Sequence, residues 1–511
     1  MKNLRIYLFA VAGMLFASCE DAIDITQPSE LSPEDTFENV ADMQLGLNGI
    51  YSSIPGENQI LFTSVFTDEV ALGRANGGQG RDGSLAFTLN SLSGDASGIW
   101  AGNYYAINLA TRLIEAAEFV VTEPGSEEET TKNTILAQAY AIRAFCHFQL
   151  LTYFSTDLTD DSALGVIAIS TTPSITDKLP RNTNGEVFAL IDTDLAFAVA
   201  NLGSGLADAQ VISNKVFFTQ EAILAFKARM ALYRGKFELA NQFVDELDAT
   251  WTVQVGGWPA NLSNTGTYAG IWEDVYAPTN ELIFALDKSL AGQSGNFSQF
   301  WSSVNTTITG SPFFEVDRTL FNLVSEGNDV RKFIITDPTA LILEDYTDPS
   351  IDYATYIDQD VLPVAKYSGN GQQNFLNDVK VFRYSEMVFI KAEYFANAGQ
   401  FGDAIAQLNL VRKARHNNQN SYALNPTDFN TATLTWGAIM DERRAELAFE
   451  GHRYIDVKRL GVKANKGLQR DPRDCEFNGF CTLPATDHRF TLPIPQDELA
   501  ANPNIIQNPG Y

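Results

Sequence analysis

The segments ARMALYRGKFELANQFV (residues 228–244) and AEYFANAGQFGDAIAQL (392–408) share one pattern: small residues, a glycine, one residue, a phenylalanine and, three positions later, an alanine. Apolar residues recur every three or four positions on both sides of the glycine, which is typical of amphipathic helices. Glycine adopts the left-handed conformation that ends a helix without a side-chain clash. We therefore expect two helices in each segment, joined at Gly235 and at Gly399, with the phenylalanine and the alanine packing them together.

This pattern resembles the tetratricopeptide helical hairpin. The two copies are 164 residues apart, so they do not form a tandem array. Helical periodicity also extends over residues 100–121, 132–154, 184–202, 215–234, 237–249, 382–397, 402–415 and 434–450. The best short strand candidate is 280–287. The sequence thus predicts a mainly α fold, a scaffold of helical hairpins with tetratricopeptide-like repeats and long irregular loops.

The predicted loops are long polar stretches rich in Gly, Asn, Ser, Thr and Asp. They cover residues 55–99, 155–182, 250–279, 288–315 and 337–378. Loops of this length in a compact protein are usually functional rather than connecting. They also contain four of the six tryptophans, namely Trp251, Trp258, Trp272 and Trp301.

The N-terminus has the features of an export signal. Lys2 and Arg5 precede an uncharged stretch, residues 6–17, that is too short to span a bilayer. Residues 16–19 (FASC) resemble the lipobox of bacterial lipoproteins, with Phe in place of the usual Leu. We expect residues 1–18 to be removed, Cys19 to be acylated and 19–36 to form a tether. The alternative is an ordinary signal peptide with a coincidental cysteine.

The composition excludes several partners. The 511-residue chain has 35 Lys and Arg against 63 Asp and Glu, a formal charge of −28, which would repel nucleic acids and anionic lipid surfaces. Four histidines are few for a metal site. Cys146 lies in an apolar helical run and is expected to be an inert core thiol. Cys475 and Cys481 are six positions apart, and export would permit a disulfide between them.

Several patterns resemble ligand sites but have a simpler interpretation. Residues 78–83 (GQGRDG) match a dinucleotide-binding glycine pattern, yet no clear strand precedes them and no helix follows at once, so a flexible loop is favoured. Two acidic clusters, Asp157, Asp160 and Asp161 and Asp345, Asp348 and Asp352, are interpreted as solvated turns, with calcium binding as the alternative. We expect no cofactor.

Glu446 and Glu450 lie four residues apart on one predicted helical face. Paired carboxylates occur in glycoside hydrolases, where one of them needs a raised pKa to act as an acid. These two lie among Arg443, Arg444, Arg453 and Arg459, whose charges would keep them ionised. A structural ion network is therefore the favoured interpretation.

Two C-terminal segments resemble signature sequences of the SusD/RagB family of Bacteroidetes outer-membrane lipoproteins. They are ERRAELAFEGHRYIDVKRLG (442–461) and LPIPQDELAANPNIIQNPGY (492–511). Residues 100–108, 137–154 and 382–399 resemble further sequence blocks of the family, in the same order. The resemblance implies a SusD-like superhelix with an N-terminal region over 37–279 and a C-terminal region over 280–511.

The two segments also carry local expectations. Leu447 and Phe449 should be buried, Gly451 should allow a turn, and residues 454–457 should form a short extended run. The four prolines of the tail exclude a helix there, so 492–511 should wrap the scaffold as an extended strap.

The resemblance further implies a function. Members of this family bind a glycan, or sometimes another nutrient, on the outer membrane and form a lid over a SusC-like TonB-dependent transporter; they are not enzymes. We therefore expect a lipid-anchored, surface-exposed protein that binds an oligo- or polysaccharide. The alternative is the same lid role for a peptide or another nutrient, and a surface glycosidase is a distant third.

The ligand-binding residues are not given by the family segments, so they are predicted on physical grounds alone. Aromatic rings on polar loops can stack on the C–H faces of sugars, and polar side chains beside them can bond hydroxyl groups. The stacking candidates are Trp258, Tyr268, Trp272, Phe300 and Trp301. The hydrogen-bonding candidates are Asn76, Arg81 and Asp95. For each aromatic residue, packing in the core or against the transporter is the alternative, and Trp100 is expected to be structural.

Overall fold

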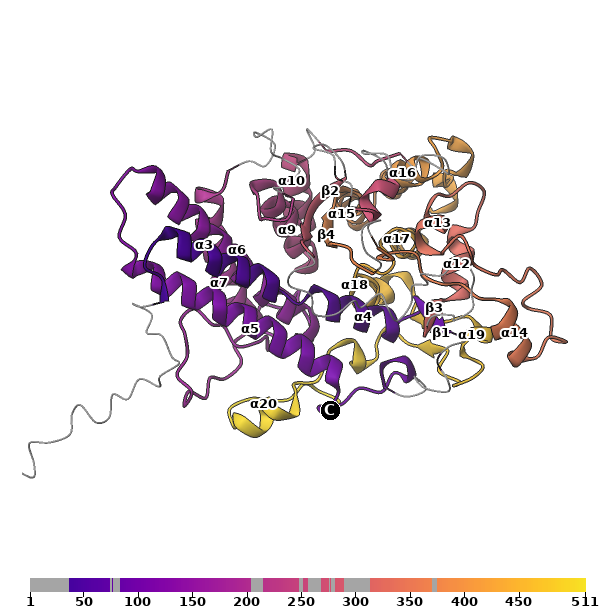
Figure 1. Cartoon of the computed structure of the whole chain (residues 1–511). Helices are drawn as coiled ribbons and strands as arrows, with labels where there is room; N and C mark the ends of the chain where they lie inside the picture. The colour runs from indigo at the N-terminus through magenta and orange to yellow at the C-terminus, as the bar shows by residue number, and fades with distance from the viewer. Residues whose placement is uncertain are drawn as a thin grey trace, which may run out of the picture.

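We describe a computed structural model of the chain. The residues described are 36–73, 76, 83–203, 215–247, 251–255, 268–274, 276, 281–288, 313–369 and 375–511. Helices dominate the molecule, and the strands are few and short (Figure 1). The predicted mainly α fold is confirmed.

A helical bundle forms the N-terminal part, at the left of Figure 1. Its members are α3 (Val40–Ser53), α5 (Gly94–Ala116), α6 (Glu127–Phe154) and α7 (Asn184–Asn201). Helix α6 begins at Ser126, whose hydroxyl accepts a hydrogen bond from the Glu129 backbone N–H. Helix α7 begins with a capping box formed by Thr183 and Glu186. These caps satisfy the free N–H groups of the first helical turns.

The two repeated segments form the helical hairpins expected of them. Their helices are α9 (Gln220–Tyr233) with α10 (Phe237–Leu247), and α15 (Tyr384–Asn397) with α16 (Phe401–Arg415). Gly235 and Gly399 have φ angles of +71° and +74°. The residue after each glycine donates its backbone N–H to the carbonyl five residues earlier, at 2.9 Å in both hairpins. Helix α10 packs on α15, so copies that are distant in sequence lie side by side.

The 442–461 segment forms a helix, a reversal and a second helix. The helices are α17 (Ala432–Leu447) and α18 (Arg453–Ala464). Leu447 and Phe449 are buried as predicted, and Gly451, at φ +85°, lies in the reversal between the helices. The predicted extended run over 454–457 is wrong, because these residues lie inside α18. The Asp456 N–H donates to the His452 carbonyl at 2.9 Å, the bond between residues four apart that defines a helix, and all four residues of the run are buried.

Among the described residues, three two-stranded antiparallel sheets connect the helical parts. They pair β1 (Val70–Leu72) with β3 (Phe314–Val316), β2 (Leu282–Leu286) with β4 (Val379–Arg383), and β5 (Leu468–Gln469) with β6 (Thr482–Leu483). Strand β2 confirms the strand predicted at 280–287. Helix α15 begins at Tyr384, two residues later than predicted, because Phe382 and Arg383 pair with β2.

Short helices occupy parts of the predicted loops. They are α4 (Gly56–Phe66), α11 (Tyr268–Trp272) and α14 (Tyr353–Gln359). Three further short helices lie outside those loops: α12 (Arg318–Val324), α13 (Arg331–Ile335) and α19 (Pro472–Cys475). The prediction that 55–99 is irregular is wrong over 56–66, over β1 at 70–72 and from residue 94 onward. Most residues of α4 are buried, including Gln59, Thr63 and Ser64, so its sequence has no polar face from which helical periodicity could be recognised.

The C-terminal segment holds the N-terminal bundle, as a strap would. The Leu492 N–H donates to the Tyr153 carbonyl at 2.9 Å, and Asn508 Nδ2 donates to the Phe154 carbonyl at 2.9 Å. The exclusion of a helix from this tail is wrong, because α20 (Gln496–Ala501) lies between two of its prolines. The boundary predicted at 279/280 stays a prediction; β1 and β3 pair across it.

Cysteine placement agrees with the sequence analysis. Cys475 and Cys481 form a disulfide, with their Cα atoms 5.3 Å apart. Cys146 is a free, fully buried thiol, and burial raises its pKa, so it is inert. Within the described ranges, no helix has the length and apolar character needed to cross a membrane.

Candidate functional site

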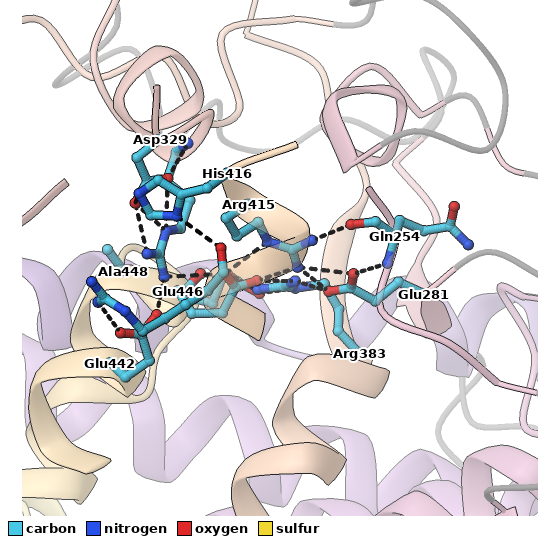
Figure 2. Close-up of polar contacts among 12 residues, drawn as sticks. Gln254, Glu281, Asp329, Arg383, Arg415, His416, Glu442, Glu446 and Ala448 are labelled. Atoms are coloured by element: carbon cyan, nitrogen blue, oxygen red, sulfur yellow. Dashed lines mark hydrogen bonds and ion pairs between the residues drawn. The ribbon is translucent and has the colours of Figure 1, made fainter. Parts of the chain in front are cut away.

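Glu446 lies at the centre of a buried ion network (Figure 2). Its Oε2 accepts a hydrogen bond from Arg415 Nε at 2.9 Å, and its Oε1 accepts from Arg415 Nη2 at 2.7 Å and from Arg383 Nη1 at 2.9 Å. The three side chains are at most 1 % exposed. They come from α17, α16 and β4, so the network joins the second repeat hairpin to the signature segment.

The network also binds a loop backbone. Arg415 Nη2 donates to both carboxylate oxygens of Glu281, at 2.8 and 2.9 Å, and Arg415 Nη1 donates to the Gln254 carbonyl at 2.6 Å. The Gln254 N–H donates to Glu281 Oε2 at 3.0 Å. Both backbone groups of Gln254 are thus held by charged side chains, which fixes the end of the 251–255 segment against the scaffold (Figure 2).

Glu450 is the second carboxylate of the pair. It accepts from Lys366 Nζ at 2.8 Å and from Arg383 Nε and Nη2 at 2.7 and 2.8 Å. Lys366 also donates to the Ala448 carbonyl at 2.8 Å. The bonds of Lys366 and Arg383 therefore hold the turn between α17 and α18 against β4 and against the segment that contains Lys366.

A further set of charges extends the network toward α12 and α13. Arg331 bonds Asp329 at 2.7 Å and Glu442 at 2.6 Å, and Arg412 bonds Glu442 at 2.8 Å. His416 Nε2 lies 3.8 Å from Asp329. Each charged residue of α17 that faces the interior therefore has an oppositely charged partner from another element.

The surrounding arginines keep the carboxyl group of Glu446 ionised. Burial alone would raise its pKa, but the attraction of Arg415, Arg383 and Arg331 outweighs burial and holds the pKa well below its usual range. A general acid needs a raised pKa, so Glu446 is unsuited to that role. The interpretation of Glu446 and Glu450 as a structural ion network is confirmed. The arginines expected to hold them do not: Arg443 pairs with Asp456, Arg444 and Arg453 pair with Asp68, and Arg459 pairs with Glu393.

A second buried pair fixes the reversal of the signature segment. Asp68, which follows α4, accepts from Arg453 Nε and Nη2 at 2.7 and 2.8 Å. Its neighbour Glu69 accepts from the Phe449 N–H at 3.2 Å. Phe449 has φ +62°, a conformation that costs free energy in a non-glycine residue, so this bond helps to hold it.

Two predicted stacking residues are buried in the described structure. Tyr268 and Trp272 form the ends of α11 and are 0 % and 5 % exposed. The Tyr268 ring lies 3.8 Å from the Arg415 guanidinium carbon, and the Trp272 ring lies 4.2 Å from Lys366 Nζ. Their rings therefore cover the ion network, and neither presents an open face to a ligand in this conformation.

The predicted hydrogen-bonding residues make local contacts. Asn76 Nδ2 donates to the Gly73 carbonyl, and Asp95, in the first turn of α5, accepts from the Ser84 hydroxyl. Burial raises the pKa of Asp95. Both side chains are half-buried, and their role toward a ligand stays a prediction.

The remaining candidates lie outside the described residues. They are Cys19, Arg81, Trp258, Phe300 and Trp301. Most of the 78–83 glycine pattern lies outside them as well. Trp100 is buried at 4 % exposure and packs edge-on against Phe154, which confirms its structural assignment.

The acidic clusters are occupied by turn contacts. Asp157 accepts from the Thr159 N–H and Asp160 from the Ser162 N–H, both at 2.8 Å. Asp352 is the N-cap of α14. In the part of the chain that the structure describes, no group of three or more His, Cys, Asp or Glu could hold a metal ion.

Sequence reasoning did not identify Glu281, Arg383 or Arg415 as partners of Glu446. One signal was available, because Arg415 continues the buried stripe of Leu408 and Val411 at helical spacing. A charged residue on an apolar stripe indicates a buried partner. The position of that partner depends on tertiary packing.

Two family models match the chain on either side of a central gap. Residues 20–232 match a family described as "Starch-binding associating with outer membrane", and residues 322–511 match the SusD family. SusD-like protein P2 of Formosa agariphila is 26% identical over 548 residues, covering 100% of both chains. A SusD-like protein of Bacteroides ovatus is 24% identical over 263 residues, 48% of this chain and 44% of that protein.

Solved structures share the fold. A SusD superfamily protein from Bacteroides thetaiotaomicron superposes with a TM-score of 0.72 at 21% identity, over 92% of this chain and 100% of that chain. A laminarin-binding SusD-like protein superposes with a TM-score of 0.66 at 21% identity, over 93% and 100%. The fold and the buried network define a helical scaffold whose paired carboxylates, Glu446 and Glu450, are held by arginine and lysine partners. The chain belongs to the SusD/RagB family.

Proposed function

We propose that this protein is a lipid-anchored outer-membrane protein that binds a glycan and serves as the lid of a SusC-like TonB-dependent transporter. The observation that carries the assignment of a ligand-binding region is the position of the gap between the two family matches. Residues 233–321 lie outside both matches, and they contain all five predicted stacking residues. A family that binds different nutrients on one scaffold is expected to vary where it contacts the ligand.

The described scaffold supports a binding role. The ion network binds the backbone of Gln254, and the rings of Tyr268 and Trp272 pack over it. These three residues lie in the gap between the family matches, so the described segments of the gap are attached to a rigid base. Rigid attachment lowers the entropy lost when a ligand binds. Tyr268 and Trp272 serve this base, which leaves Trp258, Phe300 and Trp301 as the stacking residues that we propose.

Related proteins support the choice of a glycan. One family match is described as starch-binding, and one structural neighbour as laminarin-binding. A shallow aromatic site would bind with a dissociation constant in the range of about 1 μM to 1 mM, which permits capture and release. Binding rather than hydrolysis is favoured because the paired carboxylates are committed to arginine and lysine partners.

The test is a binding panel measured by affinity electrophoresis and calorimetry. The panel contains starch, laminarin, other polysaccharides and a peptide mixture, and it is run with the wild type, Trp258→Ala and Trp301→Ala. Tyr105→Ala, which removes a 60 % exposed ring from α5, is the matched control. We expect binding of at least one polysaccharide, weakened at least tenfold by one of the tryptophan changes and unchanged in the control. Binding of peptides alone would overturn the glycan assignment.

The transporter partnership needs a separate measurement. Detergent extracts of outer membranes are purified through a tag on this protein, and the captured proteins are identified by mass spectrometry. A TonB-dependent transporter in near-equal amount is the expected result. Recovery of the protein alone, under conditions that preserve other outer-membrane complexes, would contradict the lid role.

A further inference from the structure

A cavity of about 60 Å³ lies where the two family-matched regions meet. Its wall comes from α4, α6 and α9 on one side and from the turn before α18 on the other, elements that lie near the centre of Figure 1. Gln59, Tyr153, Tyr233 and His452 are among the residues that line it. The cavity is distinct from the ion network, although Glu450 contributes to both.

Four polar side chains of this wall have polar atoms without a protein partner. Gln59 is 4 % exposed, and its Oε1 is buried without a hydrogen bond. Among the described residues, no group bonds the ring nitrogens of His452 or the hydroxyls of Tyr153 and Tyr233, which are 7 %, 3 % and 5 % exposed. Most buried polar groups in folded proteins are hydrogen-bonded, so the cavity favours an occupant that donates and accepts hydrogen bonds.

The charges of the wall indicate that this occupant is neutral. Arg229 bonds both carboxylate oxygens of Glu386 at 2.6 Å, and Glu450 is bonded by Lys366 and Arg383. Burial lowers the pKa of His452 well below its usual value, and nearby arginines lower it further, so the ring is neutral. Lys380, the remaining charged residue of the described wall, bonds the Asp274 carboxylate, so each charged side chain of that wall has a partner.

The volume decides between water and a larger molecule. One water needs about 10 to 15 Å³ of such space, so 60 Å³ accommodates about four waters. A cavity that binds benzene measures about 150 Å³, and a sugar ring is larger than benzene. The cavity is partly open, and the space within it is too small to enclose a monosaccharide.

We propose that this cavity holds a cluster of ordered waters that bridges Gln59 of α4 to His452 of the signature turn. The waters supply the hydrogen bonds that both side chains lack. They add a solvent-mediated connection between α4, α6 and α9 and the turn to the direct contacts of α18, where Tyr454 packs on Phe62 and Tyr153. The cluster is therefore an integral part of the junction between the two family-matched regions.

The test is a crystal structure of the purified protein at about 1.6 Å resolution or better, grown and frozen without polyols. We expect two or more water peaks in the cavity, within about 3.2 Å of Gln59 Oε1 and a ring nitrogen of His452. Gln59→Leu should remove the water at position 59 and keep that at His452. Asn58→Leu, at an exposed neighbouring position on α4, should keep both.

Two outcomes would overturn the proposal. One is a cavity without water density, or one in which Gln59 and His452 bond protein groups directly. The other is xenon binding in the cavity of a pressurised wild-type crystal, because xenon occupies dry apolar cavities. Neither measurement depends on glycan binding, so its result is independent of the proposed function.

Discussion

Arg415 donates two hydrogen bonds to the carboxylate of Glu446, from Nε at 2.9 Å and from Nη2 at 2.7 Å, and both side chains are fully buried. The two residues come from α16 and α17, so a bidentate contact fixes the second repeat hairpin against the signature helix. A buried charge is tolerated only when its partners are in place. The stability of the scaffold should therefore depend strongly on this pair.

Replacing Glu446 by Gln should destabilise the protein by about 3 kcal/mol, because it leaves the buried charges of Arg415 and Arg383 without their shared carboxylate. Urea unfolding measures the change. Asp441→Asn on the same helix is the matched control: its partner Lys466 and Asp441 are 41 % and 47 % exposed, so a loss below about 1 kcal/mol is expected. Equal losses in the two variants would contradict the assignment.

The free energy of unfolding should depend on pH through the ionisation of Glu69. Burial raises the pKa of Glu69 to about 7, from a usual value of 4.5. The unfolded chain ionises first, so the stability contributed by Glu69 is complete below pH 4.5 and is lost as the pH rises through 7. Glu69→Gln, which cannot ionise, should match the wild type near pH 4 and exceed its stability by about 3 kcal/mol at pH 8. A stability difference that does not vary with pH would exclude this explanation.

Gly399 and Gly402 provide a matched test of the hairpin geometry. An added Cβ would meet no atom within 4 Å at either position, but only Gly399 has a positive φ, +74°. Gly399→Ala should therefore cost about 1 to 2 kcal/mol, whereas Gly402→Ala, inside α16, should stabilise by about 0.5 to 1 kcal/mol. Thermal unfolding of both variants measures this. A gain at residue 399 would show that the left-handed turn is not required.

Cys19 should carry the lipid anchor. Each buried CH₂ of an acyl chain contributes about 0.8 kcal/mol, so several chains would hold the protein firmly in the membrane. Mass spectrometry of the mature N-terminus should find Cys19 acylated, and the wild type should partition into the detergent phase. Cys19→Ala should move to the aqueous phase. An unmodified Cys19 in a protein that remains free in the periplasm would contradict the predicted lipid anchor.

Periodic segments were predictable because their spacing is local. The hairpins at Gly235 and Gly399 follow from a glycine within two apolar stripes, and β2 follows from a short apolar run. Helix α4 was not predictable in the same way, because burial on nearly all sides removes the polar positions that define a stripe. Residues 454–457 were too few to distinguish an extended run from a helical turn.

The candidate site was predictable only in part. The sequence predicts that Glu446 and Glu450 pair with arginines, but it does not identify which ones. The partners Arg383 and Arg415 come from segments that are distant in sequence. Tyr268 and Trp272 lie in a polar stretch of sequence and yet cover this network. Local composition does not specify which aromatic ring of a loop turns inward, because that depends on charges elsewhere in the fold.

The most direct test of the central proposal, that this scaffold binds a glycan without cleaving it, is calorimetric titration of the purified protein with polysaccharides, combined with an assay for released reducing ends. We predict binding in the range of about 1 μM to 1 mM, weakened at least tenfold by Trp258→Ala or Trp301→Ala without a loss of thermal stability, and no release of reducing ends. Release of reducing ends that Glu446→Gln abolishes, or no binding of any polysaccharide, would contradict it.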